Sequence, residues 1–253
     1  SNGPTFLSSK AKHLAKYLND RIEGGVEFSA PSGSSSIAGG RGARHAWWTF
    51  EPEFPLSDRT RGPEWWSRET VEFVDFDIGP LVDLWHQGKF DSILGFSQGA
   101  VAAAMLCAEL ERKGTPPQFA ILCHGFRSPL PSNDKLLWWR ELDPGALRTP
   151  VLCIVGELDS IRGQSEALGR LFANSSLHMV VQGAHAMPKE DADLEVIRNF
   201  IVATQTMPST WTNCLPCAEK VDETSVQWSL RVCKAWARGL GCEQRACPFR
   251  HAL

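Results

Sequence analysis

The chain has 253 residues and a formal net charge of −3, with 43% hydrophobic and 22% charged side chains. This length allows one large α/β domain, or one domain with a small module, and the composition is typical of a protein with an apolar core. The small net charge argues against a polyanion-binding surface over the whole chain. No apolar stretch approaches the ~20 residues that a membrane-spanning helix needs.

The charges and the cysteines are unevenly distributed. Residues 229–253 carry five basic side chains and one acidic one, a net charge of +4, so the rest of the chain carries −7. Five of the eight cysteines lie in the last forty residues, whereas Cys107, Cys123 and Cys153 lie in apolar stretches and are predicted to be core residues. This distribution favours two modules with different partners, a cytoplasmic or nuclear location, and a metal site rather than a disulfide framework.

In the N-terminal part, residues 5–18 have apolar residues at roughly helical spacing, and Val26–Phe28 is a candidate for a short strand. Residues 31–42 are rich in serine and glycine and are predicted to be a flexible loop, because their glycines do not lie between a strand and a helix. A short helix is predicted over residues 79–87, with Gly88 ending it.

Two tryptophan pairs, Trp47-Trp48 and Trp65-Trp66, lie within a Pro-rich, charged segment. Large aromatic side chains on irregular backbone are expected over the mouth of a pocket. They would serve equally well to pack the connection against a sheet, and the sequence leaves both interpretations open.

The rest of the first two hundred residues alternates between apolar strands and helices. Strands that are apolar throughout and alternate with helices indicate an α/β domain whose parallel sheet is covered by helices on both faces. The first predicted strand begins at Ile93, and three more cover residues 119–123, 151–155 and 177–181. The predicted helices cover residues 100–112, 165–172 and 189–204.

The segment Gly95-Phe96-Ser97-Gln98-Gly99 fits the G-x-S-x-G pattern of a nucleophile elbow, with a strand before it and a helix after it. The two glycines leave room for a tight turn, and the helix directs its free N–H groups and positive dipole end toward Ser97. We therefore expect Ser97 to be a nucleophile and the backbone N–H of Gln98 to bind the oxyanion. A Gly-Ser turn in an ordinary βα unit is the alternative.

Asp159 and His185 each follow another predicted strand. Reactive residues of open parallel sheets gather at the carboxyl ends of the strands, and the chain order Ser, Asp, His is that of the α/β-hydrolases. We expect His185 to act as the general base for Ser97, and Asp159 to hold its tautomer and stabilise its charged form.

Three other residues compete for these roles. Glu157 is a second candidate acid, but it points to the opposite face if the strand continues. His124 and His178 are candidate bases. His178 lies inside a strand, and His124 follows the wrong strand for the chain order of the triad.

Residues 1 to about 204 resemble the FSH family of serine hydrolases. The resemblance implies an α/β-hydrolase fold, hydrolysis of carboxylic esters or thioesters, and a triad of Ser97, Asp159 and His185. Acyl-protein thioesterases share the elbow sequence, so the elbow does not fix the substrate. We expect Trp47, Trp48 and Phe96 to line a pocket for a hydrophobic acyl group. The matching stretches are residues 46–48, 95–100, 123–127, 156–159 and 183–188.

The resemblance also implies a segment that this sequence lacks. Members of the family begin with a buried strand that ends in a His-Gly-like loop, followed by a stretch similar to residues 1–6. That strand is expected between the Val26 strand and the Ile93 strand, and its loop brings the second oxyanion donor. We therefore expect the sequence to be a fragment of a longer product. Residues 122–126 resemble the lost loop but follow the elbow, and we do not expect them to replace it.

The basic tail contains a pattern of metal ligands that is similar to CCCH zinc fingers. Three thiolates and an imidazole form a tetrahedral zinc set, and a module this small has no core of its own, so zinc would supply most of its folding energy. Cys214 and Cys217 form a half-site without an obvious second pair. The four expected ligands are Cys233, Cys242, Cys247 and His251.

Fingers of this type commonly bind single-stranded RNA. Trp236 and Phe249 are candidates for stacking bases, and Lys234 and Arg238 for binding phosphates. The alternative is that the aromatic residues only pack the module and that it holds a protein partner. We thus expect a serine hydrolase domain over residues 1–206, a linker over 207–228 and a zinc finger over 229–253. The competing hypothesis is an RNA-binding or scaffold protein with a catalytically impaired hydrolase domain.

Overall fold

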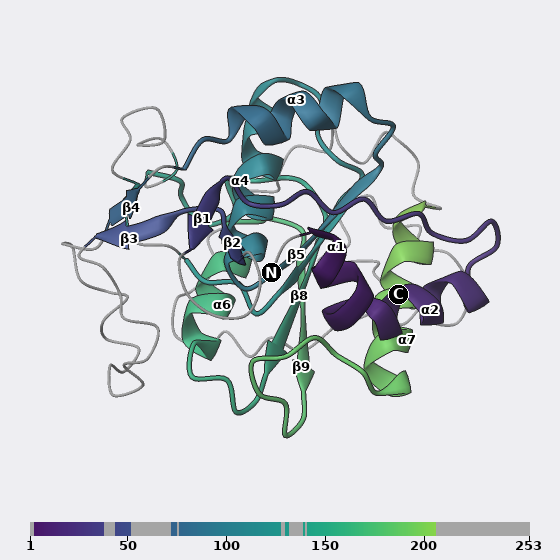
Figure 1. Ribbon diagram of the computed structural model, residues 1–253. Coiled ribbons are helices and arrows are strands. Elements are labelled where there is room, and N and C mark those ends of the chain that lie inside the picture. The colour runs from purple at the N-terminus through teal and green to yellow at the C-terminus, as the bar shows by residue number, and fades with distance from the viewer. Residues whose placement is uncertain are drawn as a thin grey trace, which may run out of the picture.

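The centre of the molecule is a parallel sheet of four strands in the order β5-β6-β8-β9 (Figure 1). These strands are Ser92–Phe96 (β5), Phe119–Cys123 (β6), Val151–Gly156 (β8) and Ser175–Val180 (β9). The computed structural model describes residues 3–37, 44–51, 72–74, 76–127, 130–131, 139 and 141–205. The predicted linker, the predicted zinc finger and Trp65-Trp66 lie outside these residues.

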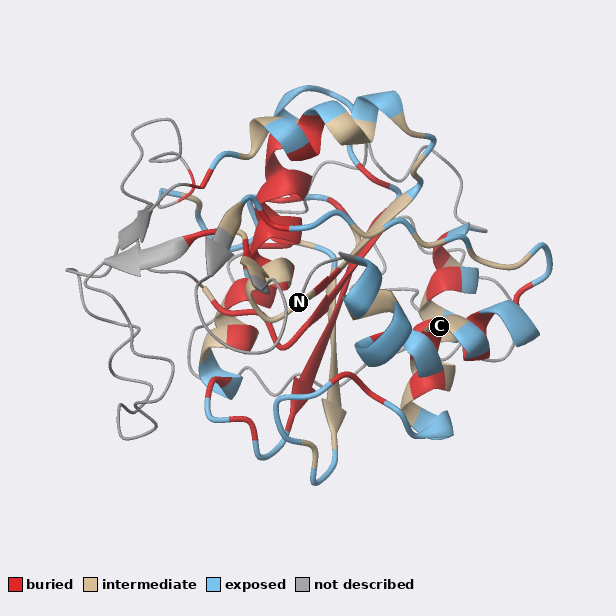
Figure 2. Ribbon diagram, in the orientation of Figure 1, coloured by how far each residue is buried: buried red, intermediate tan, exposed pale blue. Residues whose placement is uncertain are grey.

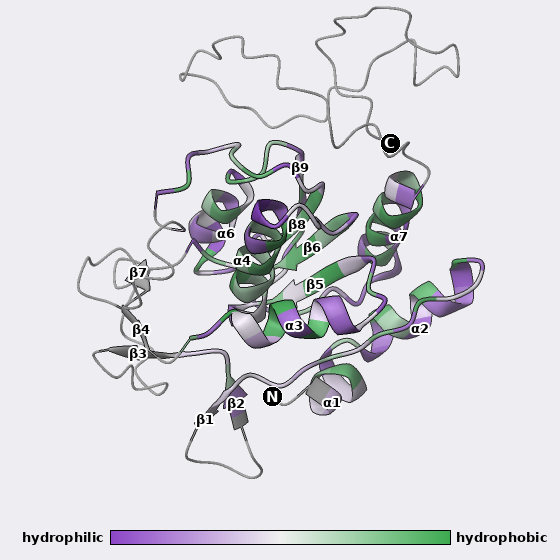
Figure 3. Cartoon of the chain, turned by 90° about the horizontal axis from the view of Figure 1, so that it is seen from above, coloured by the Kyte–Doolittle hydropathy of each residue, from purple (hydrophilic) through white to green (hydrophobic). Residues whose placement is uncertain are grey.

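Helices cover both faces of this sheet, as the apolar strands predicted (Figure 3). One face packs against α3 (Gly79–Gln87), α4 (Gln98–Arg112) and α6 (Arg162–Gly169). The other packs against α2 (Lys12–Arg21) and α7 (Asp191–Gln205). Among the described residues, no helix is long and apolar enough to cross a membrane.

The strands divide their side chains between two apolar cores. Leu122 and Cys153 belong to the core that contains α4, whereas Ile121 and Ile154 belong to the core that contains α2 and α7. Because successive side chains of a strand point to opposite faces, a strand that is buried on both faces has to be apolar throughout. The buried residues accordingly concentrate in α4 and in the central strands (Figure 2).

The register of the sheet aligns the carboxyl ends of its strands. Phe96 pairs with Cys123, Cys123 with Ile154, and Ile154 with His178. The residues that follow β5, β6 and β8 therefore meet at one edge of the sheet.

The N-terminal part differs from the prediction. The helix expected over residues 5–18 is divided into α1 (Gly3–Thr5), a π-helical turn η1 (Phe6–Lys10) and α2, with a break at Ala11. Val26–Phe28 forms no strand, because it pairs with no strand among the described residues. These three residues instead line a pocket together with β5.

Two small sheets lie beside the main one. The predicted loop over residues 31–42 contains β1 (Ser35–Ile37), which pairs antiparallel with β2 (Arg44–Ala46). The strand β4 (Glu72–Val74) pairs antiparallel with β3 (Thr49–Glu51) and parallel with β7 (Leu130–Pro131).

Candidate active site

Ser97 lies at the sharp turn between β5 and α4, in a strained backbone conformation with φ 55° and ψ −124°. A positive φ is uncommon for a residue other than glycine and is typical of functional sites. The turn is possible because Gly95 lacks a side chain: a Cβ atom there would lie 2.5 Å from the Cα of Ala100. The N–H of Ser97 donates to the carbonyl of Cys123 at 2.9 Å, which ties the turn to β6.

Ser97, His185 and Asp159 form a continuous chain of hydrogen bonds. The Oγ of Ser97 lies 2.9 Å from Nε2 of His185, and Nδ1 of His185 lies 2.8 Å from Oδ2 of Asp159. Because a carboxylate only accepts hydrogen bonds, Nδ1 carries the proton and Nε2 presents its lone pair to the serine hydroxyl. This is the geometry that converts a serine hydroxyl into a nucleophile.

The carboxyl group of Asp159 is buried but ionised. Burial raises its pKa, but hydrogen bonds from His124, His185 and the backbone N–H of Ile161 outweigh burial and hold the pKa well below its usual range. Three donors thus surround an anion whose residue is only 6% exposed. His185 is 38% exposed and faces the pocket.

Glu157 is not the acid that binds His185. Its carboxylate accepts the backbone N–H of Gln182 at 2.9 Å, in the loop that leads to His185. The N–H of Leu158 donates to the carbonyl of Gly183 in the same loop at 2.8 Å. Glu157 therefore supports the loop, and it is Asp159 that contacts the imidazole.

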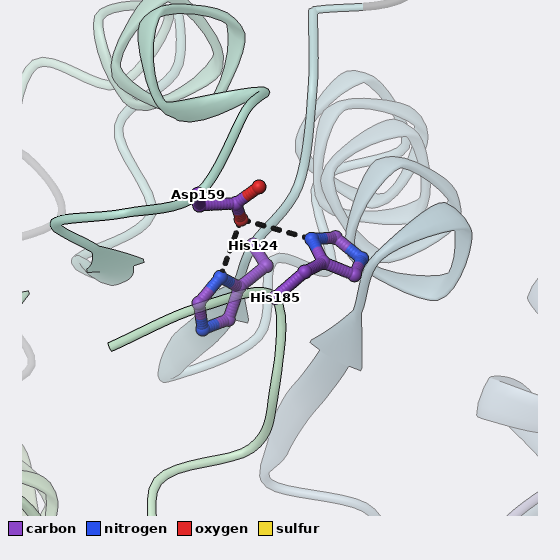
Figure 4. Close-up of side chains that lie close together, drawn as sticks. All are labelled: His124, Asp159 and His185. Carbon is purple, nitrogen blue, oxygen red and sulfur yellow. Dashed lines mark hydrogen bonds and ion pairs between the residues drawn. The ribbon is translucent and has the colours of Figure 1, made fainter. Parts of the chain in front are cut away.

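His124 lies in the site, although its position beside Asp159 is not predicted from the sequence. It follows β6, which lies between the strands of Ser97 and Asp159, and its Nδ1 is 2.7 Å from the same Oδ2 of Asp159 that binds His185 (Figure 4). The order of strands in the sheet, rather than the order in the chain, is the signal that would have found it. His178 instead binds Asp193 at the start of α7, at 2.7 Å.

A pocket of about 460 Å³ opens beside Ser97 and His185. Trp47 and Phe96 line it, as expected. Trp48 does not line it, and the expectation for this residue is wrong: its side chain is 1% exposed and packs edge-on against Phe76, with ring centroids 5.1 Å apart. Neighbouring residues on an extended segment point in opposite directions, so one tryptophan reaches the pocket and the other the core.

Gln98 takes part in the site through its backbone and its side chain. It is the first residue of α4, so its N–H has no partner in the preceding turn of the helix and lies next to Ser97. Its carboxamide accepts the N–H of Trp47 and donates to the carbonyl of Trp48, both at 2.9 Å.

The pocket continues along the whole length of β5. Residues 92–99 and residues 26–31 both line it. Among the residues that the structure describes, β5 pairs only with β6, and most of its side chains are half-buried, whereas every residue of β6 is buried. One edge of β5 thus has no hydrogen-bonded neighbour within the described sheet.

The three cysteines predicted in the core, Cys107, Cys123 and Cys153, are all buried. Burial raises the pKa of the Cys153 thiol to about 12. These thiols are therefore protonated at neutral pH and are not candidates for the nucleophile.

The chain is similar to several known proteins. The esterase OVCA2 of Bos taurus is 31% identical over 218 residues, which cover 76% of this chain and 88% of the relative. The esterase CG5412 of Drosophila melanogaster is 28% identical, and the match covers 77% of this chain but only 61% of the relative's length. Among solved structures, SOBER1 of Arabidopsis thaliana matches with a TM-score of 0.53 at 13% identity, over 81% of this chain and 94% of that one.

These matches bear on the fold and on the family. The likeness to the solved structure supports an α/β-hydrolase-like fold with a parallel sheet and flanking helices. Residues 2–197 match the model of the serine hydrolase (FSH1) family, which is more than half of the chain. The chain therefore belongs to the serine hydrolase (FSH1) family.

Proposed function

We propose that this protein hydrolyses carboxylic esters or thioesters with Ser97 as nucleophile, His185 as general base and Asp159 as the group that orients the base. The observation that carries the proposal is the pair of hydrogen bonds, 2.9 and 2.8 Å long, that joins the three side chains in the required order. The esterases among the relatives support the same reaction class.

The reaction proceeds in two halves. Ser97 Oγ attacks the carbonyl carbon while its proton passes to Nε2 of His185. The bond to the alcohol or thiol then breaks, and the leaving group takes the proton from His185, which leaves an acyl-enzyme. Water hydrolyses the acyl-enzyme by the same route, with His185 again as base. The backbone N–H of Gln98 stabilises the oxyanion of each tetrahedral intermediate.

A fluorophosphonate probe, which reacts with activated serines, tests this assignment. We expect labelling of the wild type and no labelling of Ser97→Ala or His185→Ala. His178→Ala is the matched control, because His178 also binds an aspartate at 2.7 Å but lies away from the pocket. Labelling that persists in Ser97→Ala would refute the assignment. A wild type that never labels would favour the competing hypothesis, a scaffold with an impaired hydrolase domain.

The open edge of β5 supports a second part of the proposal. We propose that a further strand pairs with this edge, between β5 and the Val26–Pro31 segment, and that the loop after it supplies a second oxyanion donor. The pocket is lined by β5, which pairs with β6 alone among the described strands, and by residues 26–31. Free strand edges of this kind accept another strand readily.

The reading frame upstream of residue 1 tests the proposal for the strand. We expect it to encode an apolar strand that ends in a His-Gly-like loop. A longer protein with this strand should exceed the 253-residue chain in kcat by about 10²–10³, the typical contribution of one oxyanion donor. Equal activity of the two proteins, measured per labelled Ser97, would overturn the proposal.

For the C-terminal part, we propose a zinc finger at residues 229–253, ligated by Cys233, Cys242, Cys247 and His251. Its support is the set and spacing of the ligands in the sequence. We expect one bound zinc per chain, and a chelator should remove it without lowering esterase activity. Loss of activity together with the zinc would contradict two independent modules.

We further propose that this finger binds single-stranded RNA. The basic residues and the aromatic residues Trp236 and Phe249 support this proposal. Binding of a labelled single-stranded RNA should weaken as salt increases and should be lost after chelation. Binding that is insensitive to zinc removal would argue for another partner.

A further inference from the structure

We infer that His124 is a positioning residue of the hydrolase site, which acts through Asp159 on the general base. The inference rests on the proposed function, because it assigns a role relative to the Ser97–His185–Asp159 chain. Figure 4 shows the arrangement: the carboxylate of Asp159 lies between the imidazoles of His124 and His185.

The first observation is that both imidazoles bind one oxygen. Nδ1 of His124 lies 2.7 Å and Nδ1 of His185 lies 2.8 Å from Oδ2 of Asp159, while Oδ1 accepts the backbone N–H of Ile161 at 3.1 Å. The carboxylate accepts and does not donate, so each Nδ1 carries a proton. His124 therefore fixes the rotation of the carboxylate and places Oδ2 opposite His185.

The second observation is that His124 has no access to water or to substrate. Its side chain is 0% exposed, and its Nε2 contacts no hydrogen-bond partner within the described part of the chain. Leaving a buried polar atom unpaired costs about 1–3 kcal/mol. An apolar residue at this position would avoid that cost. The presence of a histidine therefore points to a use for its Nδ1 hydrogen bond.

The third observation is the rigid placement of His124. Its backbone has φ 52°, in the left-handed region that residues other than glycine rarely adopt, and its N–H donates to the carbonyl of Ile154 at 2.8 Å. The ring packs edge-on against those of His185 and Phe96, with centroids 5.2 and 5.9 Å apart. The side chain is therefore held between the two strands that carry the nucleophile and the acid.

The shared oxygen has a chemical consequence. With His124 in place, the carboxylate of Asp159 offers Oδ2 to Nδ1 of His185, and His185 offers Nε2 to the hydroxyl of Ser97. His124 thus orients Asp159 and, through it, the general base.

Two substitutions separate the hydrogen bond from the shape of the side chain. His124→Asn places an N–H donor near the position of Nδ1 and tolerates a positive φ. His124→Phe retains a ring of similar size and removes the donor. Because the positive φ at this position strains the backbone of the Phe variant and lowers its folded fraction, all rates are expressed per fluorophosphonate-labelled Ser97, which counts folded, reactive sites.

In His124→Phe we expect kcat to fall about tenfold while KM changes little. His124→Asn should retain most of kcat. In proton NMR spectra, each variant should lose one of the far-downfield imidazole N–H resonances of the wild type.

Equal losses in both variants would overturn the inference, because the donor would then be irrelevant. A wild-type kcat per labelled site in His124→Phe would overturn it as well. Either result, obtained with a wild type whose activity depends on Ser97, leaves the proposed function intact. Activity that survives Ser97→Ala would instead refute the proposed function and, with it, this inference.

Discussion

The carboxamide oxygen of Gln98 accepts a hydrogen bond from the backbone N–H of Trp47 at 2.9 Å, although the two residues are 51 positions apart in the chain. The amide nitrogen of the same side chain donates to the carbonyl of Trp48 at 2.9 Å. The residue next to the nucleophile thus holds the backbone of one pocket wall. The Trp47 indole lies against the start of α4, where a Cβ atom on Gly99 would come 3.4 Å from its Nε1.

Removing this side chain should affect substrate binding more than chemistry. Gln98→Ala breaks two hydrogen bonds, each worth about 1 kcal/mol, but keeps the backbone N–H that we propose binds the oxyanion. We expect kcat/KM to fall about tenfold, mainly through a higher KM, in steady-state kinetics with an aryl ester. Gln118→Ala is the control, because that carboxamide binds only Asp91 at the opposite end of β5 and β6. A fall confined to kcat would show instead that Ser97 had moved.

The stability of the protein should depend on the ionisation of Asp159. The folded-state pKa of Asp159 is lowered, so its carboxylate stabilises the fold fully above the unfolded-state pKa of about 3.9, and this contribution is lost as pH falls toward the folded-state value. We expect the gap in unfolding free energy between wild type and Asp159→Asn to be constant from pH 6 to about pH 5 and to shrink below about pH 4. Urea unfolding at each pH measures it, and a gap that widens in acid would contradict the lowered pKa.

The two acidic residues at the end of β8 should respond differently to amide substitution. Glu157→Gln keeps an oxygen that accepts the N–H of Gln182, so we expect nearly wild-type kcat, whereas Glu157→Ala should lower kcat a few-fold by loosening the His185 loop. Asp159→Asn should lower kcat by about 10⁴, because the wrong tautomer of His185 is then favoured. A severe loss in Glu157→Gln would assign the acid to Glu157 instead.

Most of this fold follows from local sequence patterns. The strand Phe119–Cys123 has the predicted bounds, because an apolar run between turn residues leaves little freedom in its placement. Helix α6 begins at Arg162 and ends at Gly169, three residues earlier at each end than predicted. Its periodic apolar residues do not fix the first and last turns, which depend on capping and on packing.

The features that were missed depend on contacts between distant segments. Trp47 lines the pocket whereas Trp48 is buried in the core. This difference depends on which face of an irregular segment meets the core. His124 was ranked by its position in the chain, but its role follows from the position of β6 between β5 and β8. Residues 26–28 are a candidate strand from sequence, yet a strand also needs a partner, and this segment has none among the described residues.

Two glycines offer a matched test of the elbow. A Cβ atom at Gly95 would lie 2.5 Å from the Cα of Ala100 and the carbonyl oxygen of Gly99, and neither backbone atom can move without displacing α4. We therefore expect Gly95→Ala to lower the unfolding free energy by about 3 kcal/mol, and to abolish labelling of Ser97 even in the folded fraction.

Gly163 provides the control for this substitution. It lies in α6, and a Cβ atom there would have no atom within 4 Å. Gly163→Ala should raise the unfolding free energy by about 0.5–1 kcal/mol, because alanine loses less conformational freedom in a helix. Chemical denaturation of both variants, with labelling of Ser97 in the same samples, measures the difference. If Gly95→Ala kept wild-type stability and labelling, the close approach of α4 to β5 would not be what holds Ser97 in its strained conformation.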